Sequence, residues 1–416
     1  MGSIPEAWGN PEFFELYAEP SRNGVYKTSD YHGRGVPIVN MGEMFGFEFI
    51  SDQEMNRVEL NSRELTLSEI KDGDLLFGRR SVVPSGAGKC SLVVDPSEPT
   101  TFESSIIRVR LDKNSADPLF FYYFFASPTG RSLMAGIISG TNVKGIRATE
   151  LKTLKIYHPP LFEQRVIAAA LADADALVSA LEGMIAKKRD LRQAAMQHLL
   201  AGKTRLPGFS VEWELKRLGD HVRFLKNGTL SRAELANDAP VKYLHYGDIH
   251  GSDTLWLHPN SADMPCVVPA LVEVLDRLED GDLIFADASE DLAGVGKSIE
   301  IADCMGTEVV SGLHTIAARF DKAVLVDGFK AYLQFMPPLR QHLRSMAAGT
   351  KVLATNRKHI ASATLALPEP LEQTAIAEVL SDMDADLAAQ GARLTKARAV
   401  KHGMAQQLLT GRVRLV

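Results

Sequence analysis

Two windows of this sequence concentrate the donor groups that nucleic-acid contacts require. Residues 118–149 and 328–368 contain no Asp or Glu, yet both contain Lys and Arg. Each window also holds a Gly-Thr-x-Val sequence, Gly140-Thr-Asn-Val143 in the first and Gly349-Thr-Lys-Val352 in the second. Hydroxyl, amide, backbone N–H and cationic groups donate hydrogen bonds to phosphates and base edges. We therefore predict a DNA-facing surface in each window, with chance clustering of charge as the alternative.

A glycine–lysine turn precedes each window. Gly86-Ala-Gly-Lys89 and Gly294-Val-Gly-Lys297 resemble the end of a phosphate-binding loop. The complete motif fails, because Asp291 replaces its first glycine in the second turn and Cys90 replaces the magnesium-binding hydroxyl in the first. These turns are therefore predicted to be structural or DNA-facing, and ATP binding is not expected. The candidate DNA-binding residues are Lys89, Thr141, Asn142, Lys144, Arg147, Lys297, Thr350, Lys351, Asn356, Arg357 and Lys358.

Catalytic and metal-binding motifs are not found in this sequence. It has no dinucleotide fingerprint, no HExxH helix and no nucleophile elbow. Its three cysteines, Cys90, Cys266 and Cys304, are too far apart for a CxxC metal site. We therefore predict no catalytic residue, no metal ligand and no cofactor in this chain.

Composition describes an ordinary folded chain with a mild excess of negative charge. The 416 residues are 45% apolar and 24% charged, and the formal net charge is −6. Enough apolar surface is present to offset chain entropy, so the bulk of the chain is expected to fold, into two or three domains. No apolar run is long enough for a membrane helix, and Met1–Asn10 lacks the apolar core of a secretion signal. A cytoplasmic location is therefore expected, and any nucleic-acid contact must depend on local patches of positive charge.

The elements that would position these residues occur twice. Residues 159–171 reappear as residues 368–380, 209 positions later, and the register holds without a gap to the match of Leu206 with Leu415. Weaker matches at offsets of 208 and 209 relate the intervening segments, including Asp72-Gly-Asp-Leu-Leu-Phe77 and Asp280-Gly-Asp-Leu-Ile-Phe285. The order is a globular unit, a helix, a second globular unit and a second helix. The chain is therefore predicted to be a tandem duplication.

Each long repeated segment is predicted to be one helix with a coiled-coil seam. Apolar residues recur with alternating spacings of four and three, at Ile167, Leu171, Ala174, Val178, Leu181 and Ile185 in the first copy. The second copy keeps this register from Ile376 to Leu394. Each helix would span roughly 57 Å. Because the chain must return between them, the two helices are expected to pair antiparallel, the alternative being that each packs only on its own globular unit.

Each globular unit is predicted to be an α/β (α+β) domain with a mixed, largely antiparallel sheet. Strands are expected over residues 36–40, 74–77, 91–94 and 105–110, and in the second unit over 283–285, 297–301 and 314–318. A helix over residues 119–135 would bury six consecutive aromatic residues, and its counterpart would begin at Gly328. The predicted domains are residues 1–162, 163–203, 204–371 and 372–412, a unit and a helix in alternation.

The tandem pattern resembles the specificity subunits of type I restriction–modification enzymes. The resemblance rests on Pro159-Pro-Leu-Phe-Glu-Gln164, its copy at Pro368, the Leu-Leu-x-Gly endings of both helices and the Gly-Asp-Leu-Leu/Ile-Phe segments. It implies two target recognition domains that read a bipartite, asymmetric DNA site, and helices that dock two methyltransferase subunits. It also implies restriction and translocase subunits as further partners, with S-adenosylmethionine, ATP and Mg held by the partner chains.

Two other functions remain open from the sequence. A coiled-coil scaffold with two protein-binding heads would agree better with the acidic composition. An orphan DNA-binding relative, acting without a nuclease, would share every motif described above.

Overall fold

The computed structural model describes residues 5–83, 86–140, 143–347, 349 and 352–415. The chain divides into two units, Met1–Gly183 with Ala392–Val416, and Met184–Gly391. Each unit contains one globular part and a segment of both long helices. The predicted boundaries at residues 162, 203 and 371 follow the sequence repeat, whereas this division by contacts assigns part of each helix to each unit.

The first unit is built around a five-stranded sheet of order β1-β9-β5-β7-β3. Neighbouring strands are antiparallel except for the parallel pair β3–β7, so the predicted mixed, largely antiparallel sheet is confirmed. The strands are β1 (Tyr17–Asn23), β2 (His32–Val39), β3 (Phe49–Ile50), β4 (Arg57–Val58), β5 (Leu75–Gly78), β6 (Arg80–Ser81), β7 (Cys90–Val93), β8 (Thr101–Phe102), β9 (Ile106–Leu111) and β10 (Lys144–Gly145). The helices of its globular part are α1 (Met41–Gly46), α2 (Ser62–Ser68), α3 (Pro118–Ala126), α4 (Pro128–Ala135) and α5 (Ala148–Lys152).

The second unit repeats this topology with a sheet of order β12-β20-β16-β18-β14. Its strands are β11 (Glu214–Arg217), β12 (Val222–Phe224), β13 (Val241–Leu244), β14 (Trp256–Leu257), β15 (Cys266–Val267), β16 (Leu283–Ala286), β17 (Ala288–Ser289), β18 (Ser298–Ile301), β19 (Glu308–Ser311), β20 (Thr315–Phe320), β21 (Leu353–Ala354) and β22 (Thr364–Leu367). The helices of its globular part are α7 (Tyr246–Gly251), α8 (Pro337–Met346) and α9 (Arg357–Ser362). The predicted duplication therefore extends to the strand order.

Proline breaks both helices that were predicted to follow the main strands. The aromatic run Phe120–Phe125 is buried in α3 as expected. The single helix predicted over residues 119–135 is wrong, because Ser127 ends α3 and its Oγ accepts from the N–H of Gly130 to start α4 at Pro128. In the second unit a 3-10 helix, η7 (Lys330–Phe335), comes first and α8 starts only at Pro337. A residue before proline avoids helical dihedrals, which explains both breaks.

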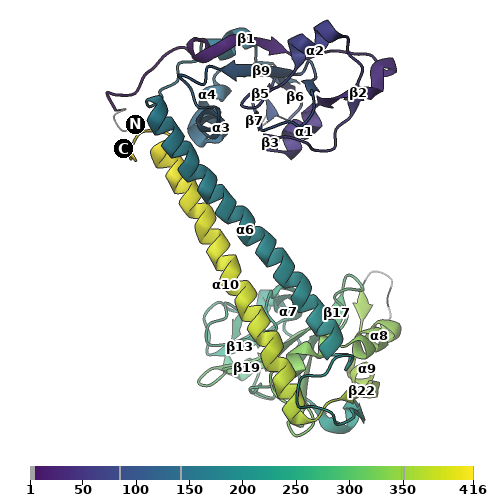
Figure 1. The fold of residues 1–416 in the computed structure, drawn as a ribbon. Coiled ribbons are helices and arrows are strands. Elements are labelled where there is room, and N and C mark those ends of the chain that lie inside the picture. The colour runs from purple at the N-terminus through teal and green to yellow at the C-terminus, as the bar shows by residue number, and fades with distance from the viewer. Residues whose placement is uncertain (1–4, 84–85, 141–142, 348, 350–351, 416) are drawn as a thin grey trace. The chain divides into compact units, whose positions relative to one another are not determined.

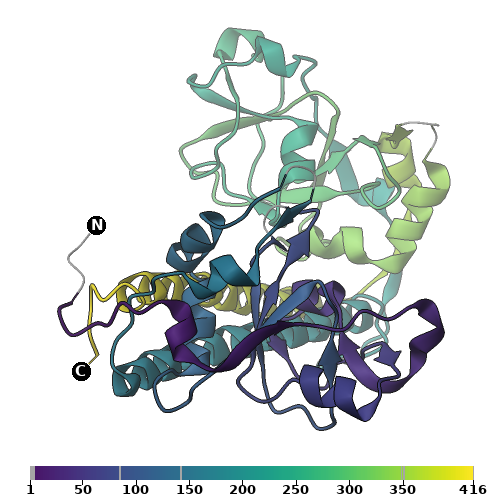
Figure 2. The ribbon, with the colours of Figure 1, turned by 90° about the horizontal axis from the view of Figure 1, so that it is seen from above.

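The long helices are confirmed as α6 (Leu161–Leu199) and α10 (Pro370–Leu408), each of 39 residues. They run side by side in both views (Figures 1 and 2). Their direction is antiparallel. In the first unit Glu182 of α6 pairs with Arg398 of α10 at 2.6 Å, and in the second unit Lys188 pairs with Asp386. The predicted seam is confirmed by Ile167, Leu171, Leu181, Ile185, Ile376 and Leu380, which are all buried.

The repeated Glu-Gln pair makes hydrogen bonds and an ion pair that hold the start of each long helix in place. Gln164 accepts from the Asp117 N–H at 2.8 Å and donates to the Pro159 carbonyl at 2.9 Å. Glu163 accepts from Arg414, beyond the end of α10, at 2.6 Å. The second unit makes the equivalent contacts, since Glu372 accepts from Arg205 at 2.5 Å. In each unit, an arginine that follows one long helix therefore forms an ion pair with the glutamate in the first turn of the other long helix. These contacts explain the repeated Glu-Gln motif structurally.

Candidate nucleic-acid interface

In each unit a two-stranded ribbon brings together the two motifs singled out in the sequence. Strand β6 pairs with β10 antiparallel, with Ser81 opposite Lys144, and β17 pairs with β21 in the same way. Strands β6 and β17 lead into the glycine–lysine turns, whereas β10 and β21 follow the Gly-Thr-x-Val loops. In each unit, two segments roughly 60 residues apart in the chain therefore lie side by side in one ribbon.

A buried serine shapes the turn that follows β6 and β17. The Ser81 hydroxyl donates to the carbonyl of Val83 at 2.7 Å, and the Ser289 hydroxyl donates to the carbonyl of Asp291 at 2.7 Å. A glycine lies against each serine, because a Cβ at Gly294 would stand 2.4 Å from the Ser289 Oγ. The serine hydrogen bond and the close approach of the glycine are thus shared by the described residues of both turns.

The two turn lysines are held by backbone carbonyls. Lys89 donates to the carbonyl of Phe45 in α1 at 3.0 Å, and Lys297 donates to the carbonyls of His250 and Ser252 at the end of α7 at 2.7 and 3.1 Å. Burial lowers the pKa of Lys89. Cations at a helix C-terminus satisfy carbonyls that have no partner within the helix. In this structure both lysines therefore connect the ribbon turn to a neighbouring helix.

The other candidates of the first unit lie at the ribbon and at the start of α5. Lys144 donates to the carbonyl of Gly140 at 2.8 Å. Arg147 directly precedes α5; its exposed guanidinium lies 4.0 Å from the Glu150 carboxylate. Thr141 and Asn142 lie outside the described residues.

The second-unit candidates gather around α9. Asn356 caps this helix by accepting from the His359 N–H at 3.1 Å. Arg357 donates to the Leu225 carbonyl and to the Asn227 side chain, at 2.7 and 3.0 Å, and Lys358 is exposed. Thr350 and Lys351 lie outside the described residues. The structure therefore brings Asn356, Arg357 and Lys358 together beside the β17–β21 ribbon.

Sequence reasoning missed the residues that flank each turn serine. Arg80 and Val82 are exposed around Ser81, and Val82 is 77% exposed. Ala288 and Glu290 take the same places around Ser289, and Glu290 is exposed. The signal that could have found them is their position beside an aligned serine where the two repeats differ.

Gly140 offers a test of the ribbon. Its φ is +106°, and a Cβ there would stand 2.2 Å from the carbonyl oxygen of Val143. On the predicted DNA-facing role of this loop, Gly140→Ala is expected to distort the loop into β10 and to weaken DNA binding through the first unit by about 10-fold or more, because misplaced donors lose their partners. Binding titrations against duplexes altered in one half-site measure this effect. Gly42→Ala, at an open helical position with nothing within 4 Å, is the matched control.

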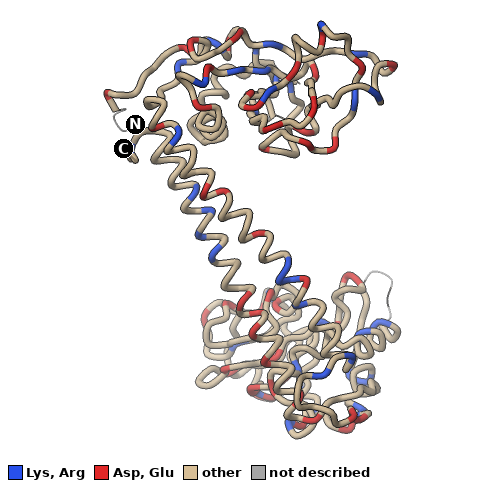
Figure 3. The backbone as a smooth tube through the Cα atoms, in the orientation of Figure 1, with Lys and Arg blue, Asp and Glu red and all other residues tan. Residues whose placement is uncertain are grey.

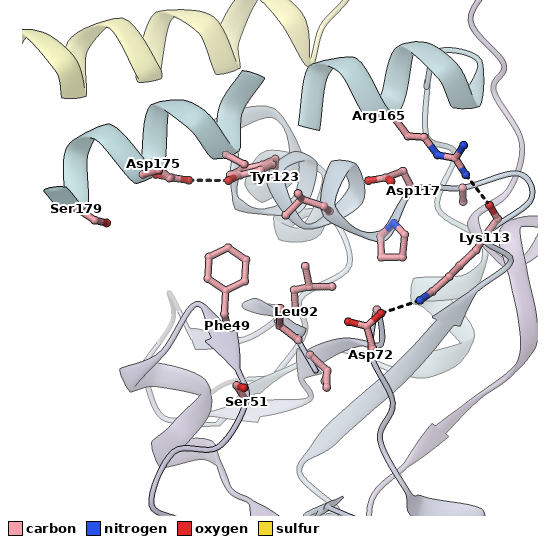
Figure 4. A pocket seen from close by; sticks show the side chains of 18 of the residues that line it. Phe49, Ser51, Asp72, Leu92, Lys113, Asp117, Tyr123, Arg165, Asp175 and Ser179 are labelled. Atoms are coloured by element: carbon pink, nitrogen blue, oxygen red, sulfur yellow. Dashed lines mark hydrogen bonds and ion pairs between the residues drawn. The ribbon is translucent and has the colours of Figure 1, made fainter. Parts of the chain in front are cut away.

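A separate pocket of about 770 Å³ lies in the first unit, between the sheet, α3 and α6 (Figure 4). Phe49 and Leu92 form part of its apolar wall. Two pairs of polar groups lie at its rim: Lys113 donates to Asp72 at 2.9 Å, and Tyr123 donates to Asp175 at 2.8 Å. None of the described candidate residues lines it, so it is distinct from the ribbon.

Positively and negatively charged residues are interspersed along the chain in each unit (Figure 3). Among the described residues, no group of three or more His, Cys, Asp or Glu side chains could hold a metal ion. A search of the same residues finds no helix with the length and hydropathy needed to cross a membrane.

Comparisons with known proteins find similarity to the same family that the sequence resembles. Residues 12–188 match the type I restriction modification DNA specificity domain. A chain of Methanocaldococcus jannaschii, named as the specificity subunit of the type I restriction enzyme MjaX, is 24% identical over 443 aligned positions, which cover 100% of this chain and 96% of the relative. The EcoKI specificity subunit of Escherichia coli is 26% identical over 217 positions, 49% of this chain and 46% of that subunit.

A solved structure shares the fold over nearly the whole chain. The crystal structure of a type I restriction–modification S subunit from M. genitalium superposes with a TM-score of 0.56 at 14% identity. It covers 98% of this chain, and 97% of that chain is matched. The fold of this chain, with two α/β units and two long helices, is therefore shared with a solved specificity subunit.

Proposed function

We propose that this chain belongs to the family of type I restriction–modification specificity subunits and is the DNA-reading, non-catalytic subunit of such a complex. The observation that supports this most directly is the ribbon that occurs twice on one scaffold, with different exposed side chains in each unit. Two similar readers with different surfaces suit a bipartite, asymmetric site. Each globular unit would recognise one half-site.

The partners follow from the same proposal. The long helices would dock two methyltransferase subunits, and restriction and translocase subunits would join through them. S-adenosylmethionine, ATP and Mg would be bound by those partners, and methylation and cleavage would be activities of the assembled complex. The complex would act on double-stranded DNA in the cytoplasm.

The proposal has a direct binding test. The full chain should bind DNA weakly alone, because its net charge is −6, and should gain sequence selectivity with its methyltransferase subunit. Gel-shift titrations with and without that subunit measure the difference. Equal, unselective binding in both cases would contradict the proposal and favour a scaffold with protein-binding heads.

Salt dependence distinguishes a DNA-contacting lysine from a structural one. Lys358 is exposed in the first turn of α9, so Lys358→Ala is expected to weaken binding uniformly across sequences. Loss of one phosphate contact should reduce the slope of log K against log salt by about 0.9. Fluorescence-anisotropy titrations at several salt concentrations measure this slope.

Lys297→Met is the matched control, because the Lys297 ammonium is bound to two carbonyls. We expect it to lower the melting temperature and to leave the salt slope unchanged. A smaller slope for Lys297→Met than for Lys358→Ala would show that the assignment of these two lysines is wrong.

A further inference from the structure

The two ribbon turns share a scaffold and differ in what they expose. In each turn the serine hydroxyl bonds to the carbonyl two residues later, at 2.7 Å in both units. Gly86 and Gly294 approach these serines closely, since a Cβ at either would stand 2.5 or 2.4 Å from the Oγ. The lysine of each turn, Lys89 or Lys297, donates to a backbone carbonyl at the end of a neighbouring helix. These shared contacts therefore place the described flanking residues at corresponding positions.

The flanking residues differ in charge and polarity between the two units. Arg80 in the first turn corresponds to Ala288 in the second, and Val82 corresponds to Glu290, each pair 208 positions apart. Val82 is 77% exposed and Glu290 is also exposed. The other two carboxylates near the second turn make contacts within the protein. Asp291 accepts from the Gly294 N–H at 2.7 Å, and Asp287 lies 3.1 Å from the His314 ring. Asp291 is exposed as well, but its Oδ1 accepts from the Gly294 N–H, so Glu290 is the exposed carboxylate of this turn that makes no such contact among the described residues.

We infer that these two positions set the different base preferences of the two half-sites, an inference that rests on the proposed DNA-reading function. A guanidinium donates to the O6 and N7 acceptors of guanine, and a valine packs against the methyl group of thymine. A carboxylate accepts from the amino group of cytosine and repels phosphate. The Arg80 turn is therefore specific for guanine with an adjacent thymine, and the Glu290 turn is specific for cytosine.

The scaffold explains why a carboxylate can serve in a DNA-facing turn. Lys358 and Arg357 lie on the neighbouring α9, and Arg344 of α8 donates to the Leu292 carbonyl within the turn at 2.8 Å. Cations beside the ribbon can offset the repulsion between Glu290 and phosphate. The carboxylate then contributes selectivity rather than affinity.

The test uses the full chain in complex with its methyltransferase subunit and selection from duplexes randomised in each half-site. Glu290→Gln is expected to lower the preference for cytosine over adenine about 10-fold or more at one position of one half-site, because an amide reads adenine in the major groove. Arg80→Ala is expected to relax a guanine in the other half-site by a similar factor. Glu273→Gln changes an exposed carboxylate away from the turn and should alter neither half-site.

The outcomes separate this inference from the function on which it rests. A change confined to one half-site in each variant, with unchanged melting temperatures, supports the inference. Unaltered preferences in both half-sites of a folded variant overturn it and leave the DNA-reading function intact. A wild-type complex that selects no bipartite sequence overturns the proposed function itself.

Discussion

Under the proposed DNA-reading function, inserting seven residues into each long helix should lengthen the gap between the two half-sites by about three base pairs. Seven residues add about 10 Å of helix, and B-DNA rises about 3.4 Å per base pair. The apolar seam repeats every seven residues, so the insertion preserves the face that each helix presents to the other. Affinity for the natural site should fall by about 10³-fold or more, because both half-sites no longer fit together.

The structure identifies where the insertions belong. Glu182 pairs with Arg398 in one unit, and Lys188 pairs with Asp386 in the other. Gly183 and Gly391 lie between these pairs on the two helices, and a Cβ at either glycine would meet no atom within 4 Å. Duplicating the seven residues that precede each glycine retains the seam register.

Methylome sequencing of cells that carry the variant measures both the gap and the half-sites. The bases of each half-site should not change, because no residue moves within its own globular part. A variant with the insertion in α6 alone should lose the antiparallel pairing and serve as the control. An unchanged gap in a folded, active double insertion would show that the helices do not set the spacing.

Replacing Glu300 is expected to change the pH dependence of stability. Glu300 is 1% exposed and accepts from the Gly328 and Ala331 N–H groups at 2.6 and 2.7 Å. Burial raises the pKa of Glu300 to about 7. The folded state therefore binds more protons than the unfolded state between about pH 4.5 and 7, and stability conferred by this group falls as pH rises through that range.

The Glu300→Gln variant removes this titration. Its free energy of unfolding relative to wild type should rise by up to about 3 kcal/mol between pH 5 and pH 8. Urea unfolding at pH 5, 6, 7 and 8 measures the difference. Glu273→Gln, at an exposed carboxylate, is the control and should track wild type. A Glu300→Gln difference that does not vary with pH would contradict the assigned protonation.

The sequence by itself predicted the duplication, the sheet type and the long antiparallel helices. The helices could be predicted because the spacing of apolar residues along one segment is enough to indicate a buried seam. Ile167, Leu171, Leu181 and Ile185 follow this spacing, and all four are buried. The repeat at 209 positions then required two similar folds. The breaks at Pro128 and Pro337 were visible locally too, but the apolar pattern outweighed them in the prediction.

The roles of individual site residues were decided only by the tertiary structure. Lys89 and Lys297 are of a residue type that commonly contacts DNA. In the fold, however, their ammonium groups donate to backbone carbonyls of α1 and α7, which are distant in sequence. Pairing of β6 with β10 and of β17 with β21 joins motifs that are far apart in the chain. Whether a polar side chain is exposed or bound depends on neighbours distant in sequence, and a spacing pattern contains no information about them. The sequence therefore determined the framework of this protein, and tertiary packing decided which side chains the ribbon turns expose.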